Sequence, residues 1–375
     1  MRIVILGAGF GGLELASRLS DAVGDDLDCT LIDKADAFVF GYSKLDLLFG
    51  KTSAEAIRIP YGELAKRGVH FRQESIESIA PEARRVVTDL ETYDADALVI
   101  ALGAGYDTAA TPGLDAGGSE FYSFDGALRA HDRLESFTSG DAVVGVCGPQ
   151  FKCPPAPSEA VVLLDAYLRD HSLRDAATIS LVMPFGTPIP PSPETSNALL
   201  ERFAQGDIRF VPDHRVTAYD AGAKQLTLDD GSTMPCDVFL AIPVHRAPEV
   251  VVASGMTEDG WIPVDRGTLA TKYPGVYAVG DVTSVGTAKA GVFAEGAGRV
   301  VAEELIAQIR GADAPAPYDG RATCYVEWGD NLVGRVEVDF FSGPSPTGTF
   351  FEPSTTITEE KAEFGATRRA RWFAA

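Results

Sequence analysis

Near the start of the chain, the pattern of apolar and polar positions predicts a strand, a glycine-rich turn and a helix. Arg2–Leu6 is a mostly apolar run, and Gly7–Gly12, with the sequence Gly-Ala-Gly-Phe-Gly-Gly, follows it directly. Leucine and alanine then recur at helical spacing from Leu13 to Leu19. A helix N-terminus that follows a glycine turn is a site for a pyrophosphate, so we expect a dinucleotide here.

The glycines and a downstream acid fit that site. Gly7 permits the tight turn, Gly9 lets backbone amides approach a pyrophosphate, and Gly12 allows close packing of the helix. A second apolar run ends in Asp33, 21 residues beyond Gly12, the spacing at which an acidic side chain binds ribose hydroxyls. A glycine turn without a ligand is the alternative, but strand, helix and acid together favour the dinucleotide. We expect this site to use Gly7, Gly9, Phe10, Gly11, Gly12, Asp33 and Lys34.

Two later apolar runs are predicted to be strands of the same unit. Residues 93–103 end in a small-residue turn, and residues 275–281 end in Gly280-Asp281. Both resemble motifs of flavoproteins with two dinucleotide domains, in which a Gly-Asp at a strand end places its carboxylate on the ribityl chain of FAD. The resemblance implies FAD rather than NAD in the first site, whereas an ordinary turn aspartate is the alternative for Asp281. Further cofactor-binding residues are expected to be Ile76, Ala101, Gly103, Gly280, Asp281 and Lys289.

The order of the predicted elements indicates the fold class: α/β, with two nested Rossmann-like dinucleotide-binding domains and a small C-terminal region. The FAD-binding domain is expected at residues 1–105 and again at 237–315, where Asp237–Ile242 would be its returning strand. The inserted NAD-like domain is expected at residues 106–236, and the C-terminal region at residues 316–375.

Hydrophobic periodicity predicts further elements within these domains. The insertion is expected to be α/β itself, and the FAD-binding domain to close with a long amphipathic helix. The expected elements are strands at 142–146 and 178–182, a helix at 158–169, an antiparallel element at 216–228, a closing helix through Val301, Leu305 and Ile309, a strand around Cys324, a turn at 342–348 and a short basic end.

Composition narrows the class of protein. The 375 residues, 45% of them hydrophobic, suffice for two or three domain cores. A net charge of −22 argues against nucleic acid as a partner, since phosphate binding needs a basic surface. No run reaches the roughly 18 apolar residues of a membrane span, and the first strand leaves no room for a signal peptide. Five cysteines, an odd number, do not suit a secreted disulfide framework. We therefore expect a cytoplasmic protein, without a metal site.

The inserted domain lacks the glycine turn that a nicotinamide dinucleotide would need. Gly145 and Gly148 lie at the end of the predicted strand, but Pro149 and the bulky residues 150–152 come next. Side chains there would block the approach of a pyrophosphate, which argues against NADH binding.

Where that turn would lie, the chain has a cysteine, a proline-rich run and a glutamate. Cys153 precedes residues 154–157, Pro-Pro-Ala-Pro, which we expect to hold the backbone extended and to direct the sulfur. Glu159 follows six residues after the thiol, at the start of the predicted helix. Alternatively, Cys153 is a small buried residue and Glu159 merely complements the helix dipole.

Two cysteine motifs resemble those of one enzyme family. Residues 153–159, Cys-Pro-Pro-Ala-Pro-Ser-Glu, are similar to the Cys-Pro-Pro-Gly-Pro-Tyr-Glu motif of flavocytochrome c sulfide dehydrogenase and of the sulfide:quinone oxidoreductases. Thr323-Cys324-Tyr325 resembles the Thr-Cys-Tyr of the same family, and the likeness extends to residues 274–282 and 289–291. The resemblance implies a redox disulfide between Cys153 and Cys324 beside the flavin, with Glu159 as a nearby acid or base.

This resemblance also implies a reaction and partners. Hydrosulfide would attack the disulfide, leaving a persulfide on one sulfur and a thiolate on the other, and electrons would then pass through FAD to a quinone or another acceptor. Cys324 is expected nearer the flavin and Cys153 on the sulfur-carrying side. The remaining cysteines, Cys29, Cys147 and Cys236, are expected to be packing residues, although Cys147 could participate.

The chain also departs from the family. Ser158 replaces a tyrosine, and residues 36–50 contain no cysteine to attach the flavin, so FAD is expected to be noncovalent. The tail is shorter than in the quinone-reducing members, whose amphipathic helices contact the bilayer. Residues 368–373, Arg-Arg-Ala-Arg-Trp-Phe, are expected either to anchor peripherally at the inner face of the cell membrane or to be a solvated end or a homodimer contact.

Three other features complete the predicted site. The apolar segment 38–49, with Tyr42 and Lys44, is expected to pass near the flavin ring, and His245 either borders the site or is incidental. Two other functions share this architecture: a type II NADH:quinone dehydrogenase, which needs the missing glycine turn, and a redox-sensing flavoprotein without turnover.

Overall fold

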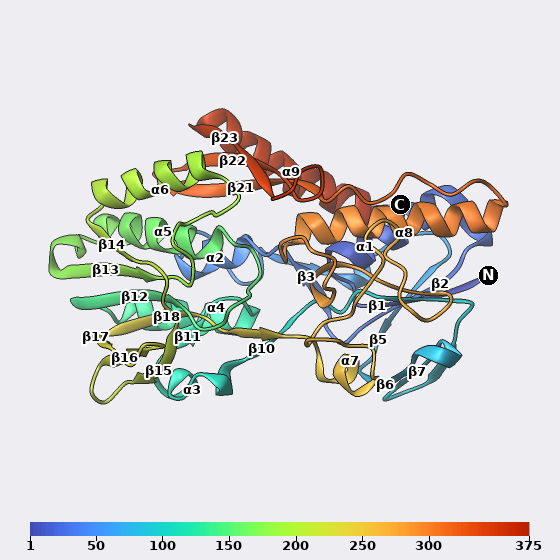
Figure 1. Cartoon of the computed structure of the whole chain (residues 1–375), viewed down its shortest axis with the longest axis horizontal. Coiled ribbons are helices and arrows are strands. Elements are labelled where there is room, and N and C mark those ends of the chain that lie inside the picture. Colours follow the sequence, from blue (N-terminus) through green and yellow to red (C-terminus); the bar gives the residue numbers. More distant parts are fainter. Residues whose placement is uncertain (375) are drawn as a thin grey trace.

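The first sheet lies at the N-terminal side of the molecule and is wholly parallel (Figure 1). The computed structural model describes residues 1–374. Helices α1 (Phe10–Val23) and α8 (Gly291–Arg310) pack against each other on one face of this sheet. In spatial order the strands are β20 (Val276–Ala278), β9 (Ala97–Ile100), β1 (Arg2–Leu6), β2 (Asp28–Asp33) and β5 (Val69–Gln73).

The second sheet forms the other half of the molecule and is also parallel. Helices α5 (Ala156–Asp170) and α6 (Pro193–Gln205) lie on one side of it, and a small antiparallel sheet lies on the other (Figure 1). Its strands are β11 (Ser119–Glu120), β18 (Val238–Ile242), β12 (Gly140–Val146), β13 (Ala177–Val182) and β14 (Ile208–Val211). The predicted α/β class with two nested Rossmann-like units is confirmed.

One strand is not where the sequence placed it. The run Asp237–Ile242, expected to return to the first unit, forms β18 and pairs with β11 and β12 in the second sheet. Its residues are buried on both faces, as in any central parallel strand, so the local pattern is the same in either sheet. The chain enters the second unit through β10 (Gly105–Asp107) and returns through β19 (Val244–Arg246), and these two strands pair with each other.

The proline-rich run begins a helix instead of an extended segment. Pro155 has φ −68° and ψ −26°, which is helical backbone, and α5 starts at Ala156 with Pro157 in its first turn. Proline is well tolerated there, because the first helical N–H groups have no partner within the helix. The expectation of an extended backbone at residues 154–157 was therefore wrong.

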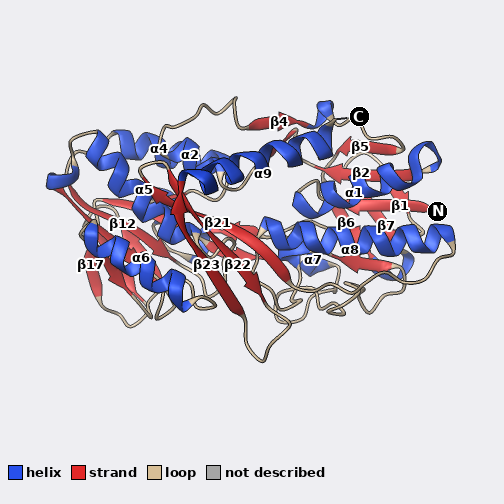
Figure 2. Ribbon diagram, turned by 90° about the horizontal axis from the view of Figure 1, so that it is seen from above, coloured by secondary structure: helices blue, strands red, loops and turns tan. Residues whose placement is uncertain are grey.

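The C-terminal region is a three-stranded antiparallel sheet followed by a long helix that crosses over both units (Figure 2). The strands are β21 (Arg321–Gly329), β22 (Leu332–Asp339) and β23 (Thr347–Ser354), and the helix is α9 (Thr355–Phe373). The sequence analysis did not predict α9. The Ser354 side chain caps it by accepting a hydrogen bond from the amide of Ile357.

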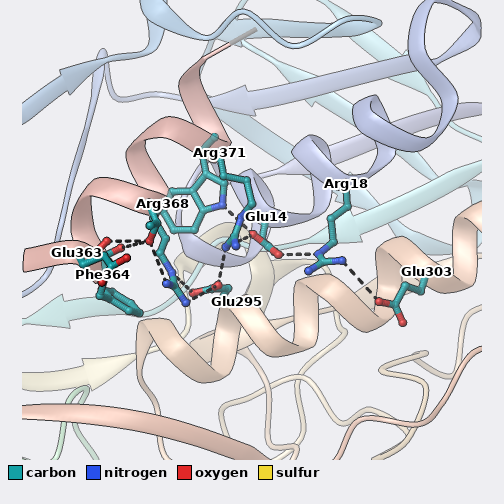
Figure 3. Close-up of polar contacts among 10 residues, drawn as sticks. Glu14, Arg18, Glu295, Glu303, Glu363, Phe364, Arg368 and Arg371 are labelled. Carbon is teal, nitrogen blue, oxygen red and sulfur yellow. Dashed lines mark hydrogen bonds and ion pairs between the residues drawn. The ribbon is translucent and has the colours of Figure 1, made fainter. Parts of the chain in front are cut away.

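The last turn of α9 packs against the first unit through its aromatic residues and two of its arginines (Figure 3). Trp372 is fully buried, and its Nε1 donates to Glu14 Oε2 at 2.8 Å. Arg371 contacts Glu14 at 2.7 Å and Glu295 at 2.6 Å, and Arg368 also binds Glu295. Residues 368–373 are thus a packed helix end and not a free tail, whereas contact of their exposed side with a membrane or with a second copy stays a prediction.

The smaller elements connect these parts. The segment 38–49 contains helix α2, which packs against α4, and the turn after β22 lies where the sequence predicted it. Within residues 1–374, no helix has the length and apolar character needed to cross a bilayer. The smaller elements are β3 (Ala37–Val39), β4 (Arg58–Pro60), α2 (Ser43–Leu48), β6 (Ile76–Ala80), β7 (Arg85–Thr88), β8 (Thr92–Asp94), α3 (Leu114–Gly117), α4 (Phe124–Glu135), β15 (Val216–Asp220), β16 (Gln225–Leu228), β17 (Thr233–Pro235) and α7 (Glu249–Ala253).

Candidate active site

The glycine turn between β1 and α1 has the geometry of a dinucleotide cradle. Gly7 has φ +102°, and a Cβ there would lie 2.4 Å from the carbonyl oxygen of Ala101. A Cβ on Gly12 would lie 1.9 Å from the carbonyl oxygen of Gly7, so helix and turn touch without room for a side chain. A Cβ on Gly9, by contrast, would meet nothing within 4 Å. The turn is therefore closed on the protein side and open at Gly9, which fits the approach of a pyrophosphate.

Asp33 lies at the end of β2, beside this turn. Its Oδ2 accepts a hydrogen bond from the amide of Ala8 at 2.8 Å and its Oδ1 accepts one from the amide of Ala35 at 2.9 Å. Lys34 is exposed next to it, and Ile76 is half-buried at the start of β6. This places the acid where a ribose joined to a pyrophosphate at Gly9 would lie.

Phe10 faces the aromatic side chains of two distant segments. Its ring makes edge-to-face contacts with Phe38 at 5.5 Å, Phe40 at 5.8 Å and Trp372 at 5.3 Å between centroids. Edge-to-face pairs at these distances are favourable. Phe10 thus ties the glycine turn to the 38–49 segment and to the end of α9.

The Gly280-Asp281 turn follows β20 and lies in the same unit. Gly280 has φ +75°, and Asp281 Oδ1 is a buried atom without a hydrogen-bond partner among the described residues. Lys289 Nζ donates to the carbonyl oxygens of Asp281 at 2.7 Å and of Thr283 at 3.0 Å. Burial raises the pKa of Asp281, opposed by the charges of Lys152, Lys289 and Lys44. An unpaired buried acceptor is costly, and a ribityl hydroxyl would satisfy it.

Ala101 and Gly103 form the end of β9 close to the first turn. The Ala101 amide donates to the carbonyl oxygen of Leu6 at 2.7 Å. Gly103 has φ +65°, and a Cβ there would meet nothing within 4 Å. Like Gly9, Gly103 therefore offers open backbone to a ligand.

Cys153 is held in an unusual conformation next to the Lys289 segment. Its φ of +53° is in the left-handed region, which costs energy for a residue with a side chain. Its amide donates to the carbonyl oxygen of Lys289 at 2.7 Å, and its own carbonyl accepts from the amide of Ala156 at 2.8 Å. The thiol is thus fixed between the start of α5 and the segment that follows Asp281.

Cys324 lies on β21, the strand that packs along α5. The link between helix and strand is Glu159, in the first turn of α5, whose Oε1 accepts from the amide of Glu327 at 2.9 Å. Each thiol is affected by the charge of Glu159, and that of Cys153 also by Cys324. The fold therefore brings Cys153, Cys324 and Glu159 together from segments about 170 residues apart.

Burial dominates the electrostatics of these three groups. It raises the pKa of Cys324 to about 12, with a further contribution from Glu159, and it raises that of Cys153 well above its ordinary value. Burial also raises the pKa of Glu159 to about 7, opposed chiefly by the nearby ammonium group of Lys361. A carboxyl group that titrates near neutrality can accept or donate a proton at physiological pH.

No second dinucleotide cradle is formed at the start of α5. A Cβ on Gly145 would lie 2.7 Å from a methyl group of Val216, so this glycine serves packing against β15. Pro155 and Pro157 have no N–H group, and the amides of Ala156 and Glu159 already bind carbonyl oxygens. With the Glu159 carboxylate in its first turn, α5 is a poor site for a phosphate.

Residues at the crossing strands line the other side of the Cys153 loop. His245 stacks edge-to-face with Tyr106 and Tyr122, both at 5.1 Å, and burial lowers its pKa to about 3, which keeps it neutral. Lys152 Nζ donates to the carbonyl oxygen of Ala104 at 3.1 Å, and Lys44 binds the carbonyl oxygen of Tyr122. His245 and Lys44 thus border the Cys153 loop.

The other cysteines lie elsewhere. Cys147 and Cys236 belong to the apolar cluster beneath the second sheet, and Cys29 is in the core of the first unit. Burial raises the pKa of Cys147 to about 12, and of Cys29 to about 12 with a smaller contribution from Asp28. Unlike Cys153 and Cys324, neither thiol lies near the charge of Glu159, and both pack among apolar side chains, as structural cysteines do.

Sequence reasoning missed the charged residues that surround Glu159. Lys361 forms a buried ion pair with Glu327, and Asp46 of α2 lies close enough to affect both Glu159 and Lys361. The sequence does contain a pattern that could have indicated Lys361, because it lies at helical spacing from Ile357, Gly365 and Trp372 and so on the same face of a helix. Reading that stripe required a helix at 355–373, which was not predicted.

Comparisons with known proteins agree with this architecture. A model of the pyridine nucleotide-disulphide oxidoreductase family matches residues 1–152 and 166–302. The mitochondrial sulfide:quinone oxidoreductase of Mus musculus is 25% identical over 374 residues, covering 95% of this chain and 82% of that protein. The solved sulfide:quinone oxidoreductase of Aquifex aeolicus superimposes with a TM-score of 0.87 at 22% identity, covering 99% of this chain and 91% of that one. NDH2 of Plasmodium falciparum in complex with NADH gives a TM-score of 0.77 at 14% identity, covering 99% and 96%.

Proposed function

Because the chain belongs to the pyridine nucleotide-disulphide oxidoreductase family, we propose that it is an FAD-dependent enzyme that oxidises sulfide through Cys153 and Cys324. The electron pair passes to a quinone or to another acceptor. The observation that carries the proposal is the convergence of both thiols on one buried carboxyl group, Glu159. The similarity to sulfide:quinone oxidoreductases over most of the chain supports the same reaction.

The residues of the first unit fit FAD. Gly7, Gly9 and Gly12 would hold the pyrophosphate and Asp33 a ribose, while the unsatisfied Oδ1 of Asp281 would bind the ribityl chain. Attachment is noncovalent, because residues 36–50 contain no cysteine. When bound, FAD would supply a two-electron acceptor for the electron pair on Cys324, and a quinone or another acceptor would take these electrons from it.

The sulfur step uses this chain's own groups. Cys153 and Cys324 are free thiols in this structure, and their oxidised form would be a disulfide. Ionised Glu159 takes a proton from hydrogen sulfide, and the resulting hydrosulfide attacks the Cys153 sulfur of that disulfide. The new S–S bond makes a persulfide on Cys153, and the broken bond leaves a thiolate on Cys324. The sulfur atom is oxidised and the protein disulfide reduced, so the electron pair resides on Cys324.

One face of β21 borders a hollow that is lined mainly by polar and charged side chains. The hollow, of about 540 Å³, lies between α8, the C-terminal sheet and α9, and Thr323 and Tyr325 line it. Successive side chains of a strand point to opposite faces, so Cys324 faces away from this hollow. An acceptor that bound in this hollow would approach β21 from the side opposite to Cys324. The cytoplasmic location expected from the sequence stays a prediction.

Anaerobic mixing of the FAD-loaded protein with sulfide or with NADH tests the proposal. We expect sulfide, but not NADH, to bleach the flavin absorbance, and Cys153→Ser or Cys324→Ser to abolish the bleaching. Cys147→Ser is the matched control, because it changes a buried packing thiol of the same loop region and should leave the rate unchanged. Bleaching by NADH alone would support a type II NADH dehydrogenase, the fold of which is similar. Bleaching by neither would support a redox sensor.

A further inference from the structure

On the premise of the proposed function, we infer that Lys361 of the C-terminal helix is a positioning residue for the thiol site. Its buried ammonium group, held by Glu327, favours the ionised form of Glu159, which accepts the proton of hydrogen sulfide. Lys361 thereby acts through Glu159 without touching the substrate.

One residue of β21 connects the lysine to the carboxyl group. Lys361 is only 8% exposed, and its Nζ forms an ion pair with Glu327 Oε1. The backbone amide of Glu327 donates to Glu159 Oε1 at 2.9 Å. Lys361 and Glu159 thus meet at the same residue, one through its side chain and the other through its backbone. An ion pair in such a buried place interacts strongly because water screens it little.

The packing of α9 fixes where this ammonium group lies. One turn beyond Lys361, Gly365 leaves space for Tyr42: a Cβ there would lie 2.2 Å from the Tyr42 hydroxyl oxygen. Lys361 Nζ lies 4.9 Å from the centre of the Tyr42 ring, within cation–π range. At its far end, α9 is held by Arg371 and Trp372 on the first unit (Figure 3).

Every element packed around Glu159 contributes a titratable group, and Lys361 is the cation among them. Burial is the main effect that disfavours a charge on Glu159, and the carboxylates of Glu327 and Asp46 add to it. The groups are Cys153 of the loop before α5, Tyr122 before α4, Cys324 and Glu327 of β21, Asp46 of α2 and Lys361 of α9.

Removal of the ammonium group would leave Glu159 buried among acids. Burial lowers the pKa of Lys361, but its hydrogen bond to Glu327 and the charges of Glu327, Glu159 and Asp46 together raise that pKa above its ordinary value, so the lysine stays charged near neutrality. Without it, Glu159 should keep its proton to higher pH. A protonated carboxyl group cannot deprotonate hydrogen sulfide, so hydrosulfide formation near neutrality would slow down.

The test measures the ionisation of Glu159 directly in the FAD-loaded protein. The infrared C=O stretch of a protonated carboxyl group that Glu159→Gln removes is followed against pH in the wild type, Lys361→Met and Lys361→Arg. We expect Lys361→Met to move the midpoint up by about one pH unit, as loss of a nearby opposite charge does, and Lys361→Arg to restore it. The rate of flavin bleaching by sulfide should show the same shift.

Arg369→Met is the matched control, because Arg369 lies on the same helix in an exposed ion pair with Glu63 at 3.5 Å. It should leave the midpoint unchanged. In the Glu159→Gln background, Lys361→Met should cause no further loss of bleaching rate. An unchanged midpoint in a folded Lys361→Met protein overturns the inference, and so does an equal shift in Arg369→Met. The infrared readout needs no sulfide, so it stands or fails separately from the proposed reaction.

Discussion

Two residues of the first glycine turn differ in their role: Gly12 is needed for packing of the turn, and Gly9 leaves space for a cofactor. Gly12 has no room for a methyl group within the protein, whereas Gly9 has open space around it. Both observations come from the distances between an added Cβ and its neighbours, so they hold without a bound ligand. The two glycines therefore offer a test of what the open space is for.

We expect Gly12→Ala and Gly9→Ala to fail in different ways. Gly12→Ala puts a methyl group 1.9 Å from the carbonyl oxygen of Gly7 and should destabilise the turn itself, lowering the free energy of unfolding by about 1–3 kcal/mol. Gly9→Ala should unfold like the wild type but retain less flavin, because the methyl group occupies the path of the pyrophosphate. Urea unfolding and the flavin-to-protein absorbance ratio measure these effects. Full flavin retention in Gly9→Ala would place the pyrophosphate elsewhere.

Glu159 gives the reaction an expected pH dependence. Burial raises the pKa of this carboxyl group to about 7, so it is neutral below pH 7 and ionised above it. Hydrogen sulfide itself ionises near neutrality, so rates are compared at a constant concentration of undissociated hydrogen sulfide. If ionised Glu159 takes its proton, the rate of flavin reduction rises with pH through this value, and Glu159→Gln should lower the rate at pH 7 by about 10²-fold. A Glu159→Gln protein with the wild-type pH profile would assign the proton transfer to another group.

At the scale of elements, helix α9 contacts both the thiol site and the core of the first unit. It carries Lys361 at the thiol site and Trp372 in the aromatic cluster with Phe10 and Phe38. The buried carboxylate of Glu14 on α1 joins Arg18, Arg371 and Trp372 (Figure 3). This network holds the end of α9 against the first unit.

Trp372→Ala should destabilise the protein by about 3–5 kcal/mol, because it empties a fully buried site and removes a hydrogen bond to Glu14. Arg369→Ala, three residues earlier on the exposed side of α9, should change the free energy of unfolding by less than about 0.5 kcal/mol. Chemical denaturation of both variants checks the difference. Similar stabilities would mean that the end of α9 detaches readily from the first unit.

At the scale of the whole molecule, the dominant property is an excess of negative charge. The chain has 54 acidic and 32 basic residues, and most of its ion pairs are at the surface. Exposed pairs contribute little to stability, whereas the repulsion among excess acids acts over the entire surface. Added salt weakens both effects, and we expect the loss of repulsion to be the larger.

The Tm should therefore rise with salt. Raising KCl from 0.1 M to 1 M shortens the Debye length from about 10 Å to about 3 Å, and we expect a gain of a few degrees, corresponding to roughly 1–2 kcal/mol. Calorimetry of the FAD-loaded protein measures it. NaCl at equal ionic strength should give the same gain, because screening does not depend on the cation. A fall in Tm with either salt would show that ion pairs outweigh the net repulsion.

Several features of this molecule could be predicted from local sequence because they depend on spacing alone. Gly7–Gly12 after an apolar run determines a strand, a turn and a helix, and the strand that ends in Asp33 follows from its own apolar residues. The alternation around Cys324 indicated β21 in the same way. The motif of residues 153–159 was identified in the sequence, but its backbone was not, because proline suits both an extended segment and a first helical turn.

The sequence by itself determined the fold class, the glycine turn and the absence of a second one, since each depends on residues close together along the chain. Only the tertiary structure decided which sheet receives β18, how α9 covers the site, and that Cys153, Cys324, Glu159 and Lys361 share one buried region. Those outcomes depend on contacts between segments far apart in sequence. The physical reason is that the residues next to a buried strand, a lysine or a cysteine in the sequence do not specify the distant segment against which it packs.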